Sequence, residues 1–394
     1  MEQERYIHLL NYIKAEKKSL SFLGFYPIKD TRKKYKILHT LSAIFFGFFP
    51  VLYNVLGLIY GYQHISNLEE FSELIGYLLT GMSITVKMMN LIWYRKNILE
   101  LEDMLENPIT TKLLSEEEEI VLKSKLKFGQ MLKKGFKIFF VIIATLHTHI
   151  LYLLFKNVDP NSIVLLMWFP FNVEDYLYEV YISEFFIVPM LAFINSTLDM
   201  LNVTLMDLCS VQFELLKHRL KRFGRISHEE EGMDDAVVYD KLSKIIIHQN
   251  YVYRFSEIVE ETFSVSVFCQ LATTVVVLCC AIFKVVITPI NSLQFVVRAM
   301  YSCTMGLEII FYCCYGQKVL DSSSTISEAC FMSNWHHCSI KVQKNMVLLM
   351  SRANRSVTMQ AGGMFPLTLE TLMSIWRSAY SFLTFLMQVY KEDN

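Results

Sequence analysis

Residues 38–60 read LHTLSAIFFGFFPVLYNVLGLIY, a run of 23 residues without Asp, Glu, Lys or Arg. The hydrocarbon core of a bilayer is about 30 Å thick, so a helix needs about 20 mainly apolar residues to cross it. No short apolar stretch with a cleavage site precedes this run. The stretch therefore predicts a membrane-spanning helix, and with it the fold class of the chain.

Six further segments meet the same requirement of length and apolarity. They are Phe71–Tyr94, Phe136–Phe155, Glu184–Met206, Ser264–Val286, Leu293–Tyr315 and Leu367–Tyr390. Of the 394 residues, 53% are hydrophobic and 19% are charged, against roughly 45–50% and about 25% in soluble domains. We therefore predict an all-α membrane protein with seven transmembrane helices.

Lys and Arg alternate between the segments that connect these windows. The segments 1–37, 61–70, 95–135, 157–183, 211–257, 287–292 and 316–366 carry nine, none, eight, none, eight, none and five of them. Because cytoplasmic segments are enriched in Lys and Arg, the pattern places the N-terminus in the cytoplasm and the C-terminus outside. A G-protein-coupled receptor has the opposite orientation, and we expect the chain not to be one.

The sequence carries no catalytic motif: Gly-x-Ser-x-Gly, a phosphate-binding loop and His-Glu-x-x-His are all missing. The formal net charge of −1 gives no reason to expect nucleic acid as a partner. Cys330, His336, His337 and Cys338 cluster in the sequence, but their spacing fits no common zinc pattern. We expect neither an enzyme nor a metal site, and no cofactor.

Four charged residues fall inside the apolar windows at a similar depth, in the inner third of the bilayer. They are Lys87, Asp199, Glu308 and Arg377. Charges within a membrane are a pointer to function because they are costly there. The first interpretation is two ion pairs, with Glu308 on Lys87 or Arg377 and Asp199 on the other. The alternative is that each side chain reaches separately to the cytoplasmic interface.

The C-terminal third resembles the insect odorant receptor family. The resemblance rests on FYCCYGQKVLDSSS from Phe311 with Trp335 after it, NMVLLMSRANR from Asn345, AGGMFPLTLETL from Ala361, and the ending SAYSFLTFLMQVY from Ser378. The stretch WFPF from Trp168 also fits. Gustatory receptors are the related alternative, but the chain departs from their ending at Ala379-Tyr380 and Gln388-Val389. It also lacks the length of the family's shared co-receptor, so it resembles a ligand-tuned subunit.

The resemblance implies an odorant-gated, nonselective cation channel subunit. Such subunits form a heterotetramer with the co-receptor, bind a small volatile odorant, and lie among lipids in the plasma membrane of olfactory sensory neurons. The implied parts are a cytoplasmic N-terminus (1–37), helices one to four with the ligand pocket (38–210), a cytoplasmic loop and helix extension (211–263), helices five and six (264–315), a cytoplasmic anchor (316–366), and a pore helix with a short extracellular tail (367–394).

In the family, the pocket lies in the outer half of the subunit between helices two, three, four and six. Side chains three or four residues apart share a helix face, which selects pairs of aromatic, hydroxyl and thioether groups suited to a small volatile. The expected ligand-binding residues are Tyr77, Thr80, His147, Thr148, Tyr152, Met190, Ile194, Tyr301 and Thr304. Ordinary packing between helices is the alternative for any one of them.

The resemblance also implies that the last helix lines a central pore. Aligning its end with the family places Phe385 and Val389 on the inward face, with Ser381 one turn before and Gln388 bordering it. A ring of Phe385 side chains would close the pore by excluding water. The alternative is that Phe385 packs between subunits and only supports the helix.

Overall fold

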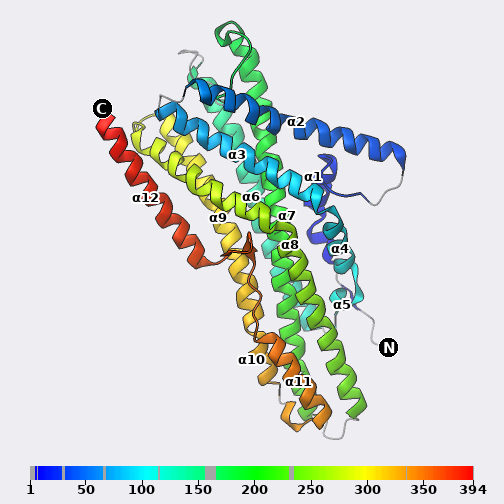
Figure 1. Cartoon of the computed structure of the whole chain (residues 1–394). Coiled ribbons are helices and arrows are strands. Elements are labelled where there is room, and N and C mark those ends of the chain that lie inside the picture. The colour runs from blue at the N-terminus through cyan, green and yellow to red at the C-terminus, as the bar shows by residue number, and fades with distance from the viewer. Residues whose placement is uncertain are drawn as a thin grey trace.

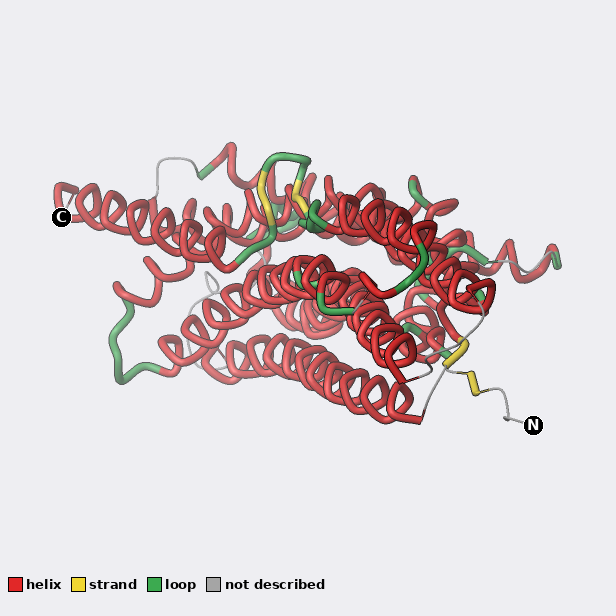
Figure 2. The backbone as a smooth tube through the Cα atoms, turned by 90° about the horizontal axis from the view of Figure 1, so that it is seen from below, coloured by secondary structure: helices red, strands yellow, loops and turns green. Residues whose placement is uncertain are grey.

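The computed structural model describes residues 5–6, 8–28, 32–64, 68–113, 116–155, 166–229, 235–333 and 335–393. It is almost entirely helical, and two short strand pairs lie at the margins of the helices (Figure 2). The elements are β1 (Arg5–Tyr6), a 3₁₀ turn (Leu9–Tyr12), α1 (Lys14–Phe22), α2 (Lys33–Gln63), α3 (Leu68–Trp93), α4 (Arg95–Glu106), α5 (Pro108–Thr111), β2 (Lys112–Leu113), α6 (Glu116–Phe155), a 3₁₀ turn (Val173–Tyr176), α7 (Leu177–Glu229), α8 (Asp235–Ile287), α9 (Leu293–Ser324), α10 (Ile326–Phe331), a 3₁₀ turn (Trp335–His337), α11 (Ile340–Ala353), β3 (Gln360–Ala361), β4 (Phe365–Pro366) and α12 (Leu369–Asp393).

Each of the seven apolar windows corresponds to one helix, namely α2, α3, α6, α7, α8, α9 and α12 in chain order, although Tyr94 lies just after α3 and Leu367 and Thr368 just before α12. Among the described residues, five helices or helical runs are long and apolar enough to cross a membrane. These lie in α2, α3, α7, α8 and α9, while α6 and α12 are not among them. The chain is therefore an all-α, multi-span membrane protein.

Two of the helices are much longer than a bilayer is thick. The α7 and α8 helices have 53 residues each, which at 1.5 Å per residue makes each about 80 Å long. The charged stretches that follow the fourth window and precede the fifth continue these helices, as the spacing of their apolar residues indicates. The long helices run side by side to the end of the molecule where α10 and α11 lie (Figure 1).

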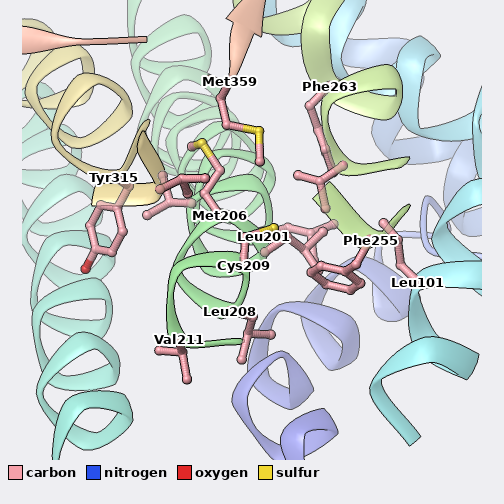
Figure 3. Packing of buried hydrophobic residues seen from close by; sticks show 14 of the residues in the cluster. Leu101, Leu201, Met206, Leu208, Cys209, Val211, Phe255, Phe263, Tyr315 and Met359 are labelled. Atoms are coloured by element: carbon pink, nitrogen blue, oxygen red, sulfur yellow. The ribbon is translucent and has the colours of Figure 1, made fainter. Parts of the chain in front are cut away.

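The buried core follows these long helices. Side chains of α7 such as Leu201 and Cys209 face Phe255 and Phe263 of α8 (Figure 3). By contrast, α2 leaves many large apolar side chains exposed along its length. Exposed apolar surface of this extent indicates contact with lipid.

The α12 helix meets the rest of the bundle along one side only. Ile375 and Ala379 are buried there, and α12 packs against α8 and α9. The other sides of α12 are exposed in the single chain, and the helix projects from the bundle in Figure 1. The β3–β4 hairpin directly precedes it.

Gly316 of α9 allows the chain entering α12 to lie directly on α9. A Cβ at this position would stand 2.3 Å from the carbonyl oxygen of Leu367 and 2.4 Å from its Cβ. Overpacking of this kind typically costs about 1–3 kcal/mol. We expect Gly316→Ala to lower the melting temperature of the purified receptor by several degrees. Gly135→Ala is the matched control, because a Cβ there meets nothing within 4 Å among the described residues; equal melting temperatures for the two variants would contradict the prediction.

Candidate functional site

A cavity of about 100 Å³ lies between five helices of the bundle. Its lining comes from α2 (Tyr53), α3 (Tyr77, Thr80, Ile84), α6 (Phe140, Ile143, Ala144), α7 (Val188, Leu191, Ala192, Asn195) and α9 (Tyr301, Thr304, Met305). A dry cavity of about 150 Å³ holds benzene in another protein. The cavity therefore suits a ligand of about that size or smaller.

The threonine hydroxyls in the lining are bound to their own helices. Thr80 Oγ1 donates to the carbonyl oxygen of Gly76 at 2.9 Å, and Thr304 Oγ1 donates to that of Met300 at 2.7 Å. The rings of Tyr77 and Tyr301 lie 5.5 Å apart, with their planes tilted by 42°. These contacts turn methyl groups and ring faces toward the cavity, which makes it mainly apolar.

Tyr53 is one of two polar residues in the lining that the sequence interpretation missed, the other being Asn195. Its side chain is 4% exposed, and its hydroxyl has no hydrogen-bond partner among the described residues. An unsatisfied buried hydroxyl costs about 1–3 kcal/mol. Its apolar surroundings in the first window gave no signal that Tyr53 would face the interior.

Four of the nine expected ligand-binding residues line the cavity, namely Tyr77, Thr80, Tyr301 and Thr304. His147, Thr148 and Tyr152 lie in α6, but their side chains are outside the part of the chain that the structure describes. From α6, the lining takes residues nearer the cytoplasmic end of its window, the first of them Phe140.

The structure places a different face of α7 on the cavity from the one expected. Met190 and Ile194 do not line the cavity, and Ile194 is fully buried in the core. The lining residues of α7 are shifted by one or two positions to Val188, Leu191 and Asn195. From Leu191 onward α7 is buried on nearly all sides, so its sequence carries no polar face from which its rotation could be read.

Asn195 joins the cavity to a buried ionic network. Its side-chain oxygen accepts a hydrogen bond from Lys87 Nζ at 2.8 Å, and its Nδ2 donates to Glu308 Oε1 at 3.3 Å. Lys87 Nζ also forms ion pairs with Asp199 and, at 3.0 Å, with Glu308 Oε1. Tyr312 donates its hydroxyl to Asp199 Oδ1 at 2.6 Å. One lysine thus holds carboxylates from α7 and α9 together.

The expectation of two separate ion pairs needs correction in one respect. Both Asp199 and Glu308 meet Lys87, and Arg377 forms no ion pair with any described residue. Arg377 follows Ile375 by two positions on α12, so it points to the opposite side of that helix from the buried contact. Arg377 lies at a similar depth in its window to Lys87, Asp199 and Glu308, but a shared depth does not place it in contact with them.

The expected pore residues lie on the free part of α12. Ser381, Phe385 and Gln388 are exposed in the single chain. Val389 is within α12, but its side chain is outside the described part. Their exposure leaves them available to a neighbouring subunit or to a pore.

A second buried polar cluster lies at the opposite end of α7 and α8. Arg219 donates to His248 Nδ1 at 3.2 Å, and His248 Nε2 lies 3.0 Å from the side-chain oxygen of Gln212. Because guanidinium can only donate, His248 carries its proton on Nε2 and donates it to Gln212. Burial, and then the charge of Arg219, hold the pKa of His248 well below its usual range. The ring is therefore neutral at cytoplasmic pH, and the cluster fastens α7 to α8.

The cysteines and histidines near residue 330 form no metal site in the described structure. Cys330 is buried, whereas His336 and His337 are exposed. Among the described residues, no group of three or more His, Cys, Asp or Glu side chains could hold a metal ion.

Comparison with known proteins agrees with this architecture. The sequence profile described as "7tm Odorant receptor" matches residues 67–380. Odorant receptor 24a of Drosophila melanogaster is 23% identical over 96% of each chain, and Odorant receptor 94a of the same species is 22% identical over 86% of this chain and 87% of its own. The structure of olfactory receptor OR5 from Machilis hrabei in complex with eugenol superposes with a TM-score of 0.82 at 15% identity, covering 97% of this chain and 99% of that one.

The fold defines the class as an all-helical, multi-span membrane protein, and its helices border a mainly apolar cavity. The chain belongs to the insect odorant receptor family, and its named relatives are tuning receptors, not the co-receptor. Members of this family are ion channels and not enzymes. The match sets aside the gustatory receptor and the G-protein-coupled receptor as alternatives.

Proposed function

We propose that the chain is the tuning subunit of an odorant-gated, nonselective cation channel. It assembles with the co-receptor as a heterotetramer in the plasma membrane of olfactory sensory neurons. The observation that carries the proposal is the apolar cavity bordered by Asn195, which is itself part of the Lys87 network. Family membership and the fold shared with an olfactory receptor support it.

We assign a separate function to each part of the chain. The ligand pocket belongs to the part before residue 211, with α9 completing its wall. The segments 211–263 and 316–366 form the cytoplasmic anchor, and α12 lines the pore in a seven-span arrangement. The core packing of α7 and α8 and the projection of α12 from the bundle support this division.

A ligand opens the channel only if it binds the open arrangement more tightly than the closed one. A volatile in the cavity touches Asn195 and the α9 residues Tyr301 and Thr304. Asn195 bonds Lys87, and Lys87 bonds Glu308 on α9. A ligand that changes the spacing of α7 and α9 therefore acts on this network, and α12 packs against α9.

The direct test is current recorded from cells that express this chain with the co-receptor, without it, and the co-receptor alone. A panel of small volatiles is applied to each. We expect at least one volatile to open a cation current that requires both subunits. Failure of every volatile of suitable size, with both subunits at the cell surface, would contradict the proposal.

Tyr53 is expected to orient ligands that carry an oxygen atom. Its buried hydroxyl has no partner among the described residues, so a ligand oxygen would gain a hydrogen bond worth about 0.5–1.5 kcal/mol. Tyr53→Phe should therefore raise the half-maximal concentration of an activating alcohol or ketone by about 2- to 12-fold. A hydrocarbon agonist of similar shape should be unaffected.

Thr304→Val is the matched control for Tyr53→Phe. It also removes a lining hydroxyl, but one that already bonds the Met300 carbonyl, and we expect little change for either ligand. An equal response of Tyr53→Phe receptors to the alcohol and the hydrocarbon, relative to wild type, would remove Tyr53 from ligand recognition.

A further inference from the structure

A basic groove lies between the N-terminal segment and α6, and none of its lining residues lines the odorant cavity. It has a volume of about 290 Å³ and nine lining residues. They are Asn11, Tyr12, Lys14, Ala15, Glu16, Lys18, Gln130, Lys133 and Lys134. Four of the nine are lysines, and only Glu16 is acidic. Lys14 and Lys18 share a face of α1 because they are four residues apart.

Three of these lysines have unneutralised charges. Lys14, Lys18 and Lys134 are exposed, and none of them forms an ion pair with a described residue. Neighbouring lysines differ: Lys17 pairs with Glu102, and Lys133 Nζ lies 2.9 Å from Asp207 Oδ2. The groove thus concentrates the positive charge of three lysines that form no ion pair with a described residue.

The carboxyl of Glu16 does not cancel this charge. It is buried, and its Oε2 has no hydrogen-bond partner among the described residues. Burial raises the pKa of Glu16, and the nearby Lys137, Lys133 and Lys134 lower it by less. A raised pKa favours the uncharged carboxyl, and a single acid faces four lysines, so the groove stays positive.

The groove lies next to the start of the third apolar window, Phe136–Phe155, and beside exposed apolar side chains. Phe22, at the end of α1, is 70% exposed, and its ring centroid lies 5.7 Å from that of Phe46 on α2. On α6, the exposed side chains of Ile138 and Phe139 follow Lys134 after four and five residues, about one helical turn. Charged residues followed by exposed apolar ones mark the boundary between headgroups and hydrocarbon. The Lys and Arg pattern places this boundary on the cytoplasmic side.

We propose that the basic groove binds the phosphorylated headgroup of an anionic lipid of the cytoplasmic leaflet. Lys14, Lys18 and Lys134 supply the charge, since lysine binds phosphate as a point charge. Basic pockets beside membrane helices on the cytoplasmic side suit such headgroups. The adjoining exposed apolar surface favours a lipid over a free phosphate, because it can hold the acyl chains.

Lys133 connects the groove to the packing of the long helices. Lys133 lines it and bonds Asp207 of α7, and Lys318 of α9 bonds the other oxygen of Asp207 at 2.7 Å. A headgroup phosphate beside Lys133 competes with Asp207 for its charge. Lipid binding therefore acts on the contact between α6, α7 and α9, independently of any odorant.

The test uses the purified full-length receptor and a fluorescent short-chain phosphatidylinositol bisphosphate as the probe. The groove variant is Lys14→Gln/Lys18→Gln/Lys134→Gln. Each lysine near a membrane surface contributes about fivefold in affinity, so we expect the variant to bind the probe about a hundredfold more weakly. The matched control, Lys96→Gln/Lys221→Gln/Lys344→Gln, removes the same charge from exposed sites on α4, α7 and α11 and should lose less than about tenfold.

Three further measurements decide the outcome. Gln130→Glu, which adds an acid to the groove without removing a lysine, should also weaken binding while the melting temperature stays that of wild type. Unlabelled phosphatidylinositol bisphosphate should displace the probe, whereas phosphatidylcholine should not. Equal losses in the groove and control variants, or displacement by inorganic phosphate or soluble inositol trisphosphate as effective as by the lipid, would overturn the proposal.

Discussion

Replacing Lys87 with glutamine is expected to remove nearly all folded receptor from the cell surface. Lys87 is buried and is the cation shared by Asp199 and Glu308. Without it, two carboxylates face each other in an interior that water does not reach. Breaking a buried ion pair in this way costs roughly 3–5 kcal/mol, which is a large share of the 5–15 kcal/mol that stabilises a typical domain. Surface labelling of a tagged receptor measures the effect.

Two further variants separate the loss of the network from a general sensitivity to substitution. Lys87→Gln combined with Asp199→Asn and Glu308→Gln leaves no uncompensated charge, so we expect it to recover part of the surface signal. Lys123→Gln removes a lysine whose pair with Glu119 is exposed, and such pairs contribute little. Normal surface levels of Lys87→Gln, or no recovery in the triple variant, would show that the network is not required for folding.

The helices could be predicted from the sequence because each one is indicated by a contiguous stretch of residues. An apolar run such as residues 38–60 predicts a span from its own length, and the structure has one helix there, Lys33–Gln63. The charged stretch after residue 211 continues a helix for the same reason: its apolar spacing repeats with the period of an α-helix. The resemblance of the C-terminal third to the insect odorant receptors is likewise carried by contiguous residues, and the family match confirms it.

The site was harder to predict because it depends on how helices are rotated against one another. Tyr77 and Thr80 could be selected because they lie three residues apart and so share a helix face, and both line the cavity. The sequence of α7 has no polar face from which its rotation could be read. Ile194 was therefore predicted to line the cavity, where the structure has Asn195. Tyr53 lies in a span that otherwise faces lipid, so only the packed structure brings it to the cavity wall.

The members of the ionic network could also be predicted only in part. Depth in the membrane correctly grouped Lys87, Asp199 and Glu308, because depth follows from counting residues along each helix. It also grouped Arg377, whose direction from α12 depends on tertiary contacts. Depth is thus encoded in the sequence, whereas lateral position requires the fold.

Replacing Phe385 with alanine is expected to raise the ligand-free current of the heteromer several-fold. The Phe385 side chain is 62% exposed in the single chain, on the part of α12 that the bundle does not cover. Ser381 lies one turn away on the same face. If α12 lines the pore, as we propose, Phe385 forms an apolar constriction, and such constrictions close a pore by excluding water. A smaller side chain widens the ring and admits water in the closed state.

A residue on the opposite side of α12 provides the control for Phe385→Ala. Leu383 lies two residues before Phe385 and so faces the opposite side of the helix; Leu383→Ala should leave the ligand-free current unchanged. Gln388→Arg adds a positive charge beside the same face and should reduce permeability to divalent cations, since cations are repelled by a ring of arginines. A Phe385→Ala channel with wild-type basal current, together with a Gln388→Arg channel of unchanged ion selectivity, would place both residues at a contact between subunits and away from the pore. Because neither side chain takes part in the odorant cavity, the agonist rank order should be preserved in both variants, which distinguishes a change in the gate from a change in ligand recognition.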